Sequence, residues 1–195
     1  MGVLSHFIFM NGNGMKRMFS HGARVSVLGA LLLCGFARVF FAASPAVALP
    51  LAPSFAARSL DGKVVASTQL AGKAYIVNFF ASWCPPCCAE VPDMVALQKK
   101  YERNGFTFIG VAVNENVPAI RAFITKNHIT YPVVMADDKI VSAFSRYVSG
   151  GLNAIPTSFV VNPSGRISLV ITGARSKDDF EKIIVDTLKK TGTPQ

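Results

Sequence analysis

The sequence predicts an α/β domain with a central mixed sheet flanked by helices, and three observations lead to this prediction. Short runs of β-branched and aromatic residues recur from residue 74 onward. Stretches with apolar residues at helical spacing lie between these runs. The last two runs are joined by only a short turn, which makes them antiparallel neighbours. Strands that alternate with helices and then close with a hairpin are typical of a mixed sheet.

The composition of the 195 residues fits one folded domain with an additional segment. Hydrophobic residues make up 51% of the chain and charged residues 16%, which excludes a largely disordered protein, since disorder needs low hydrophobicity and high charge. The 11 prolines and 15 glycines are too few for a fibrous chain. Four cysteines are too few for a disulfide-stapled mini-protein.

The net charge of +9 is concentrated at the amino-terminal end of the chain. Residues 1–48 carry four basic side chains and no acidic one, and the first acidic residue is Asp61. The rest of the chain is only mildly basic, and its lysines and arginines form no dense run. Because a nucleic-acid surface needs clustered basic residues, we expect no nucleic-acid partner.

The first residues have the features of an export signal, and we expect 1–48 to be a signal peptide or an uncleaved membrane anchor. Basic residues precede an apolar stretch over 25–37, and 46–48 form a small-x-small cleavage site. The longer stretch 25–43 could span a bilayer and anchor the chain. In both cases the domain is expected on the periplasmic side of the bacterial inner membrane.

The mature chain is predicted to begin with a Pro- and Ala-rich tether at 49–57, followed by a folded domain over 58–192. An Asp-Gly pair within 59–63 separates two short apolar runs and predicts an N-terminal hairpin. The continuous apolar run 74–81 has the length of a strand that is buried on both faces. Helical spacing of apolar residues then predicts a helix over 86–103.

The middle of the domain continues the alternation of strands and helices. Gly105 ends the first helix, and a second buried strand is predicted at 106–113. Apolar spacing predicts a helix over 117–127 and, after a short strand at 131–135, another helix over 138–147.

The end of the domain is predicted to form a hairpin and a final helix. Strands at 157–162 and 167–172 are separated by the turn residues 163–165. Ser176 is expected to cap the last helix and Gly192 to end it.

The pair Cys84 and Cys87 carries the strongest chemical signal in the sequence. The two cysteines lie three residues apart where a predicted strand meets a predicted helix, and residues at that spacing share a helix face and can close a disulfide. Free N–H groups at a helix N-terminus favour a thiolate at Cys84. Pro85 and Pro86 suit the first helical turn, where N–H groups lack partners. We therefore expect Cys84 to attack a disulfide and Cys87 to resolve the mixed disulfide.

Other uses of this cysteine pair remain open or are disfavoured. In an exported protein the pair could be a purely structural disulfide. A zinc site would need two further ligands, and the three histidines of the chain form no ligand-spaced pair. The thiol-peroxidase pattern has Thr and Pro ahead of a single attacking cysteine, where this chain has Ala81 and Val77.

Two motifs resemble those of the thioredoxin superfamily, in particular its TlpA/ResA/DsbE-like thiol-disulfide oxidoreductases. The first is NFFASWCPPC, followed by Glu90 and Pro92, and the second is the segment 155–165. The resemblance covers roughly residues 50–190. It implies a thioredoxin-like fold in which 110–137 is the family's extra αβ insertion.

The resemblance also implies which residues form the site. In that family the proline matching Pro156 is cis and faces the two cysteines. Because proline has no backbone N–H, a cis bond there would leave neighbouring backbone groups free to pair with an extended substrate peptide. An ordinary proline at a strand start is the alternative. Trp83, next to the first cysteine, is expected to be a partly exposed shield over the disulfide, with plain core packing as the alternative. The residues predicted to bind the substrate are Trp83, Pro85, Pro86, Ile155 and Pro156.

Three further residues near the motif have distinct expectations. Asn78 stands where cytoplasmic thioredoxins carry a buried aspartate, and Glu90 matches a glutamate associated with the active site in the ResA branch. On a helix Glu90 lies one turn beyond Cys87 and could exchange a proton with that thiol, unless it is simply a solvated surface residue. Cys88 points about 100° away from Cys87 and is predicted to be a spectator, with an additional exchange partner or dimerising thiol as the alternative.

The predicted function is therefore dithiol-disulfide exchange with exported proteins that contain cysteines, without a cofactor or metal. By resemblance, the expected direction is reduction, for example of apocytochrome c or copper-protein thiols, with re-reduction of Cys84 and Cys87 by an inner-membrane electron donor. Two alternatives remain: an oxidase that donates disulfides, and a peptide-binding module or chaperone without redox turnover.

Overall fold

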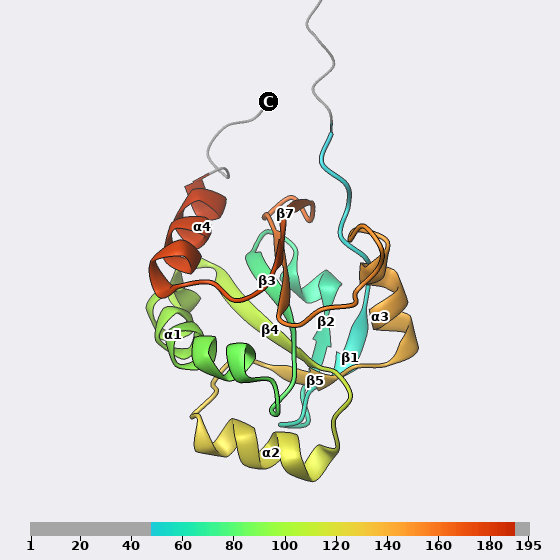
Figure 1. Cartoon of the computed structure of the whole chain (residues 1–195). Coiled ribbons are helices and arrows are strands. Elements are labelled where there is room, and N and C mark those ends of the chain that lie inside the picture. Colours follow the sequence, from blue (N-terminus) through green and yellow to red (C-terminus); the bar gives the residue numbers. More distant parts are fainter. Residues whose placement is uncertain (1–47, 190–195) are drawn as a thin grey trace, which may run out of the picture. The chain divides into compact units, whose positions relative to one another are not determined.

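The centre of the structure is a five-stranded sheet in a computed structural model that describes residues 48–189 (Figure 1). The strand order is β5-β4-β3-β6-β7, with β3, β4 and β5 parallel to one another and β6 and β7 antiparallel to their neighbours. The predicted mixed sheet is thus confirmed. The strands are β3 (Ala74–Phe80), β4 (Phe106–Ala112), β5 (Val133–Met135), β6 (Thr157–Val161) and β7 (Ile167–Thr172).

Helices pack on both sides of this sheet. Helices α1 and α4 pack against each other and share a buried apolar cluster with one face of β3, whereas α3 contributes to the cluster on the other face. The predicted cap of the last helix is present, because Ser176 Oγ accepts a hydrogen bond from the Asp179 N–H at 3.2 Å. The helices are α1 (Pro85–Tyr101), α2 (Val117–Lys126), α3 (Asp138–Ser145) and α4 (Lys177–Lys189), with short 3₁₀ turns at Ser67–Leu70 and Glu102–Asn104.

Strand β3 is the central element of the core, and all seven of its residues are buried. Its side chains alternate between the two faces: Ile76 and Phe80 lie in the cluster with α1 and α4, and Val77 and Phe79 in the cluster with α3. The predicted burial on both faces is confirmed. Asn78 shares the face of Ile76 and Phe80 by this alternation, and so it faces α1.

The N-terminal hairpin is formed by β1 (Ala56–Arg58) and β2 (Val64–Ala66), which pair antiparallel. The Asp-Gly turn joins them, and Gly62 adopts a φ of 89°, a conformation that glycine tolerates without strain.

The segment predicted as a tether, 49–57, differs from that expectation over part of its length. The Ala52 N–H donates to the Gly165 carbonyl at 2.9 Å, Leu51 forms a β-bridge with Arg166, and 56–57 belong to β1. The reason is that the backbone groups of this segment pair with the turn before β7 and with β2.

The predicted signal peptide or anchor, 1–48, lies outside the described residues apart from Ala48, as do the last residues of the predicted domain, 190–192. Within 48–189, no helix combines the length and the hydrophobicity needed to cross a bilayer.

Candidate active site

The two cysteines lie where β3 leads into α1, as expected from the sequence. Cys84 is the N-cap residue of α1, with extended backbone angles, and its sulfur is bonded to that of Cys87 in a disulfide with a Cα–Cα distance of 5.2 Å. The Cys87 N–H points at Cys84 Sγ, 3.3 Å away. Cys84 is 4% exposed and Cys87 fully buried, so Cys84 is the more accessible residue of the pair.

Pro85 and Pro86 occupy the first two positions of α1 and are exposed. Neither carries an N–H, so the first N–H of the helix that is free to meet a sulfur is that of Cys87. A backbone N–H at a helix N-terminus stabilises negative charge on Cys84 Sγ once the disulfide is reduced.

The loop before β6 lies beside the cysteine pair. The Ile155–Pro156 peptide bond is cis, and Cys84 Sγ lies 3.9 Å from the Ile155 carbonyl oxygen. The Gly173 N–H donates to the Pro156 carbonyl at 2.8 Å, which joins this loop to the one between β7 and α4. The implied cis conformation is therefore present, and the residue before Pro156 lies beside Cys84.

Trp83 presents an exposed indole next to the pair. The residue is 58% exposed, and its Nε1–H donates to the Asn114 carbonyl at 3.2 Å. The neighbouring Ser82 N–H donates to the Glu115 carboxylate. Sequence reasoning singled out Trp83 but missed this contact with the loop after β4. A usable signal existed, since β3 and β4 were both predicted as buried strands and parallel strands end at the same edge of a sheet.

Glu90 is buried inside the fold, so the interpretation as a solvated surface residue is wrong. It is 3% exposed, and its Oε1 and Oε2 accept hydrogen bonds from Asn78 Nδ2 at 2.9 Å and the Arg175 N–H at 3.3 Å. Burial raises the pKa of Glu90 to about 7, against the opposing effect of those two donors. A carboxyl group with this pKa exchanges protons readily near neutral pH.

Asn78 connects Glu90 to the centre of the sheet. Its amide donates a second hydrogen bond to Ser158 Oγ on β6 at 2.9 Å, and all three side chains are buried. Ser158 and Arg175 were not singled out in the sequence, because their contacts depend on how distant elements pack.

Cys88 remains a free thiol, half-buried, with its Sγ–H donating to the Ser82 carbonyl at 3.2 Å. It takes no part in the Cys84–Cys87 disulfide.

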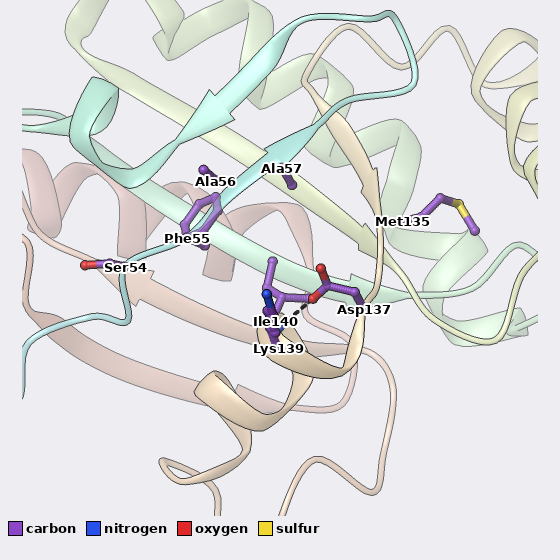
Figure 2. A pocket seen from close by; sticks show the side chains of 8 residues that line it. All are labelled: Ser54, Phe55, Ala56, Ala57, Met135, Asp137, Lys139 and Ile140. Atoms are coloured by element: carbon purple, nitrogen blue, oxygen red, sulfur yellow. Dashed lines mark hydrogen bonds between the residues drawn. The ribbon is translucent and has the colours of Figure 1, made fainter.

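Two pockets on the described part of the chain are lined by none of the site residues named above. One cavity of about 170 Å³ lies between β1 and the start of α3, where Asp137 caps the helix by accepting from the Ile140 N–H at 2.7 Å (Figure 2). A second of about 370 Å³ lies at the end of α1 near Gln98 and Lys73. Among residues 48–189, no group of three or more His, Cys, Asp or Glu side chains is arranged to hold a metal ion.

The fold and the cysteine pair together define the class, a thioredoxin-like thiol-disulfide oxidoreductase. More narrowly, the chain belongs to the Redoxin family, whose model matches residues 48–186.

Individual relatives agree with this assignment. The chain is 30% identical over 145 residues to "Thiol-disulfide oxidoreductase ResA" of Geobacillus thermodenitrificans, which covers 73% of this chain and 80% of that protein. The ResA of Halalkalibacterium halodurans is 29% identical over 87% of this chain and 94% of its own. A crystal structure of a thiol:disulfide interchange protein from Chlorobium tepidum TLS superposes with a TM-score of 0.72 and 50% identity, covering 73% of this chain and 99% of that one.

Proposed function

We propose that this protein reduces disulfides in exported proteins by exchange with the Cys84–Cys87 pair. The observation that carries the proposal is the position of the disulfide, with Cys84 at the N-cap of α1 beside the Ile155 carbonyl and with a buried carboxyl, Glu90, farther along the same helix. The names of the relatives, thiol-disulfide oxidoreductase and thiol:disulfide interchange protein, support the same reaction type.

In the first step the Cys84 thiolate attacks one sulfur of a substrate disulfide. A mixed disulfide forms between Cys84 and the substrate, and the second substrate sulfur leaves as a thiolate and takes a proton. The Cys87 N–H, which points at Cys84 Sγ, stabilises the attacking thiolate.

In the second step Cys87 loses its proton and attacks the Cys84 sulfur. The Cys84–Cys87 disulfide forms, and the first substrate sulfur leaves as a thiol, so that two electrons have passed to the substrate. Because the pKa of Glu90 is about 7, its ionised form can accept the Cys87 proton at neutral pH and return it later.

The substrate peptide is proposed to lie against the exposed surface around Cys84. Trp83, Pro85 and Pro86 offer exposed apolar area near the sulfur, and the half-buried Ile155, which precedes the buried Pro156, brings its carbonyl oxygen to within 3.9 Å of Cys84 Sγ. An extended peptide can pair with free backbone groups of such a loop, which provides affinity without a fixed substrate sequence.

The direction of electron flow and the location complete the proposal. We expect the reaction to take place on the periplasmic side of the inner membrane, where an electron donor in the membrane re-reduces the pair. The export-like leader, 1–48, supports this location, and the reductase direction is what the resemblance to the TlpA/ResA/DsbE-like oxidoreductases implies.

A trapping experiment tests the proposal. The full chain carrying Cys87→Ser is expressed in a bacterial host and alkylated, and proteins bound through Cys84 are identified by mass spectrometry. Without its resolving thiol the variant should accumulate mixed disulfides with exported proteins that contain cysteines. If no mixed disulfides form, the protein is a binding module without redox turnover.

Two variants serve as controls for this test. Cys84→Ser should abolish both trapping and insulin reduction, whereas Cys88→Ser, a change at the next residue after Cys87, should leave both near wild type. The reduction potential then decides the direction. A value near about −270 mV supports a reductase, and one near about −120 mV supports the oxidase alternative.

A further inference from the structure

The loop after β4 lies against the segment that presents Cys84. Strands β3 and β4 are parallel, and their last residues, Phe80 and Ala112, are in register. The Val113 N–H extends this pairing by donating to the Phe80 carbonyl at 3.0 Å. The two chain segments that follow, 81–84 and 113–116, therefore leave the sheet side by side.

Two hydrogen bonds join these segments directly. The Trp83 indole donates to the Asn114 carbonyl at 3.2 Å, and the Ser82 N–H donates to the carboxylate of Glu115, which is half-buried. Asn114 has a φ of 50°, and asparagine is one of the few residues that tolerate this left-handed conformation. The backbone turn at Asn114 thus directs both acceptors toward the cysteine loop.

Glu115 also brings a negative charge to this loop. Its carboxylate is bonded to the backbone only two residues before Cys84, and within residues 48–189 no recorded ion pair involves it. A nearby carboxylate disfavours a second negative charge, and so it acts against the thiolate form of Cys84. A reduced pair whose thiolate is less stabilised is the stronger electron donor.

We propose that Glu115 is a positioning residue for disulfide exchange, which fixes the Ser82–Cys84 segment through a backbone N–H and makes the reduced cysteine pair a stronger reductant. The direction of this effect rests on the proposed reductase function. The proposal assigns to the loop after β4, which lies within the predicted insertion 110–137, a part in tuning the cysteines.

Two substitutions separate the charge of Glu115 from its hydrogen bond. Glu115→Gln keeps an oxygen that accepts from the Ser82 N–H but removes the charge, and Glu115→Ala removes both. Glu102→Gln is the matched control, because Glu102 is an exposed carboxylate beyond the far end of α1. All variants are made in the full chain with Cys34→Ser and Cys88→Ser, so that alkylation reports on the active pair alone.

The first readouts are the pH midpoint of Cys84 alkylation and the equilibrium of the pair with glutathione. In Glu115→Gln the alkylation midpoint should move to lower pH, and the glutathione equilibrium should shift about threefold toward the dithiol form, as expected for loss of one partly screened charge. Glu102→Gln should change neither quantity.

The second readout is the emission of Trp83, the one tryptophan of the chain. It should change in Glu115→Ala, where the segment is released, and remain near wild type in Glu115→Gln. The proposal would be overturned if the glutathione equilibrium were the same in Glu115→Gln as in Glu102→Gln. It would also be overturned if that equilibrium shifted only in Glu115→Ala.

The test is independent of the proposed function in one respect. The difference between Glu115→Gln and wild type measures the effect of Glu115, whereas trapping by Cys87→Ser and the absolute potential measure the function. An oxidase-like potential with a normal Glu115→Gln shift would overturn only the direction of electron flow.

Discussion

Glu90 on α1 and Asn78 on β3 are joined by a buried hydrogen bond of 2.9 Å, across the interface between the helix and the sheet. The bond has two opposite consequences for the carboxyl group. Packing against the sheet removes Glu90 from water and raises its pKa, while the amide of Asn78 stabilises the ionised form and limits that rise. The result is a pKa of about 7, close to the pH at which a proton must be moved.

The first prediction concerns stability against pH. The pKa of Glu90 in the folded protein, about 7, is above the value of 4.5 for an unperturbed glutamate, so the folded state holds this proton more tightly. Stability should therefore fall as pH rises from about 4.5 to 7, by up to about 3 kcal/mol from this group. Glu90→Gln removes this loss. Urea unfolding of the oxidised protein at pH 4.5 and 8 measures the difference.

The control for this measurement is Glu102→Gln, an exposed change that should retain the wild-type dependence on pH. Parallel stability profiles for wild type and Glu90→Gln would show that the buried carboxyl does not titrate in this range.

A second prediction concerns the Asn78 amide. Asn78→Ala removes the donor that opposes burial, so the pKa of Glu90 should rise further and the pH optimum of insulin reduction should move to higher pH. Ser158→Ala is the matched control: it leaves the Asn78–Glu90 bond in place and deprives the amide only of its second acceptor. It should reduce stability by about 1 kcal/mol with little change in the pH optimum. Equal shifts in the two variants would contradict the role of Asn78.

A third prediction concerns the packing of β4. A Cβ atom added at Gly110 would lie 2.9 Å from Phe80 Cε1 and 3.2 Å from Val133 Cγ2, closer than side chains normally approach. Gly110→Ala should therefore lower the free energy of unfolding by about 1–3 kcal/mol through overpacking. Urea unfolding measures the change, and an unaltered midpoint would mean that the Phe80 ring moves aside freely.

Much of the fold could be predicted because local patterns and tertiary burial agree. The run that became β3 is apolar apart from Asn78, since the strand is covered on both faces, and Asn78 is the residue that bonds to Glu90. The Cys84–Cys87 pair could be predicted for a similar reason, because three-residue spacing at the start of a helix is a local property of the chain.

The surroundings of the cysteines could not be predicted in the same way. Glu90 receives its hydrogen bonds from Asn78 and Arg175, which are 12 and 85 residues away in the sequence. Glu115 bonds to Ser82 only because β3 and β4 are parallel and in register. Such contacts follow from strand order and helix packing, which single-sequence patterns do not specify.

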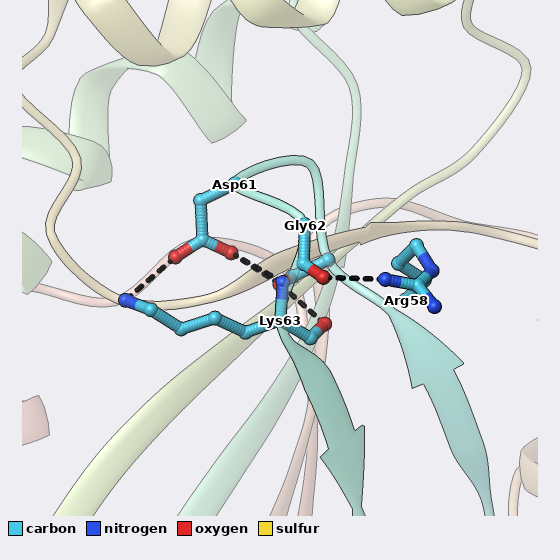
Figure 3. A network of polar contacts seen from close by, with 5 residues as sticks. Arg58, Asp61, Gly62 and Lys63 are labelled. Atoms are coloured by element: carbon cyan, nitrogen blue, oxygen red, sulfur yellow. Dashed lines mark hydrogen bonds and ion pairs between the residues drawn. The ribbon is translucent and has the colours of Figure 1, made fainter.

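The last prediction concerns the turn of the N-terminal hairpin, where Asp61 accepts hydrogen bonds from the Ser59 hydroxyl and the Lys63 side chain (Figure 3). These bonds, that from Ser59 most of all, lower the pKa of Asp61 to about 2. The stability that this provides is present above about pH 4 and is lost as pH falls through 2. It should be less than about 1 kcal/mol, because the carboxylate is half exposed.

Carboxyl NMR titration of Asp61 in two variants tests which partner dominates. Ser59→Ala should raise the pKa of Asp61 toward 3.8, and Lys63→Gln should raise it by less, because the hydroxyl makes the larger contribution. High salt should weaken only the contribution of Lys63, since screening acts on the ion pair and not on the bond between neutral and charged partners. A larger rise in Lys63→Gln than in Ser59→Ala would show that the ion pair, and not the serine, holds the turn.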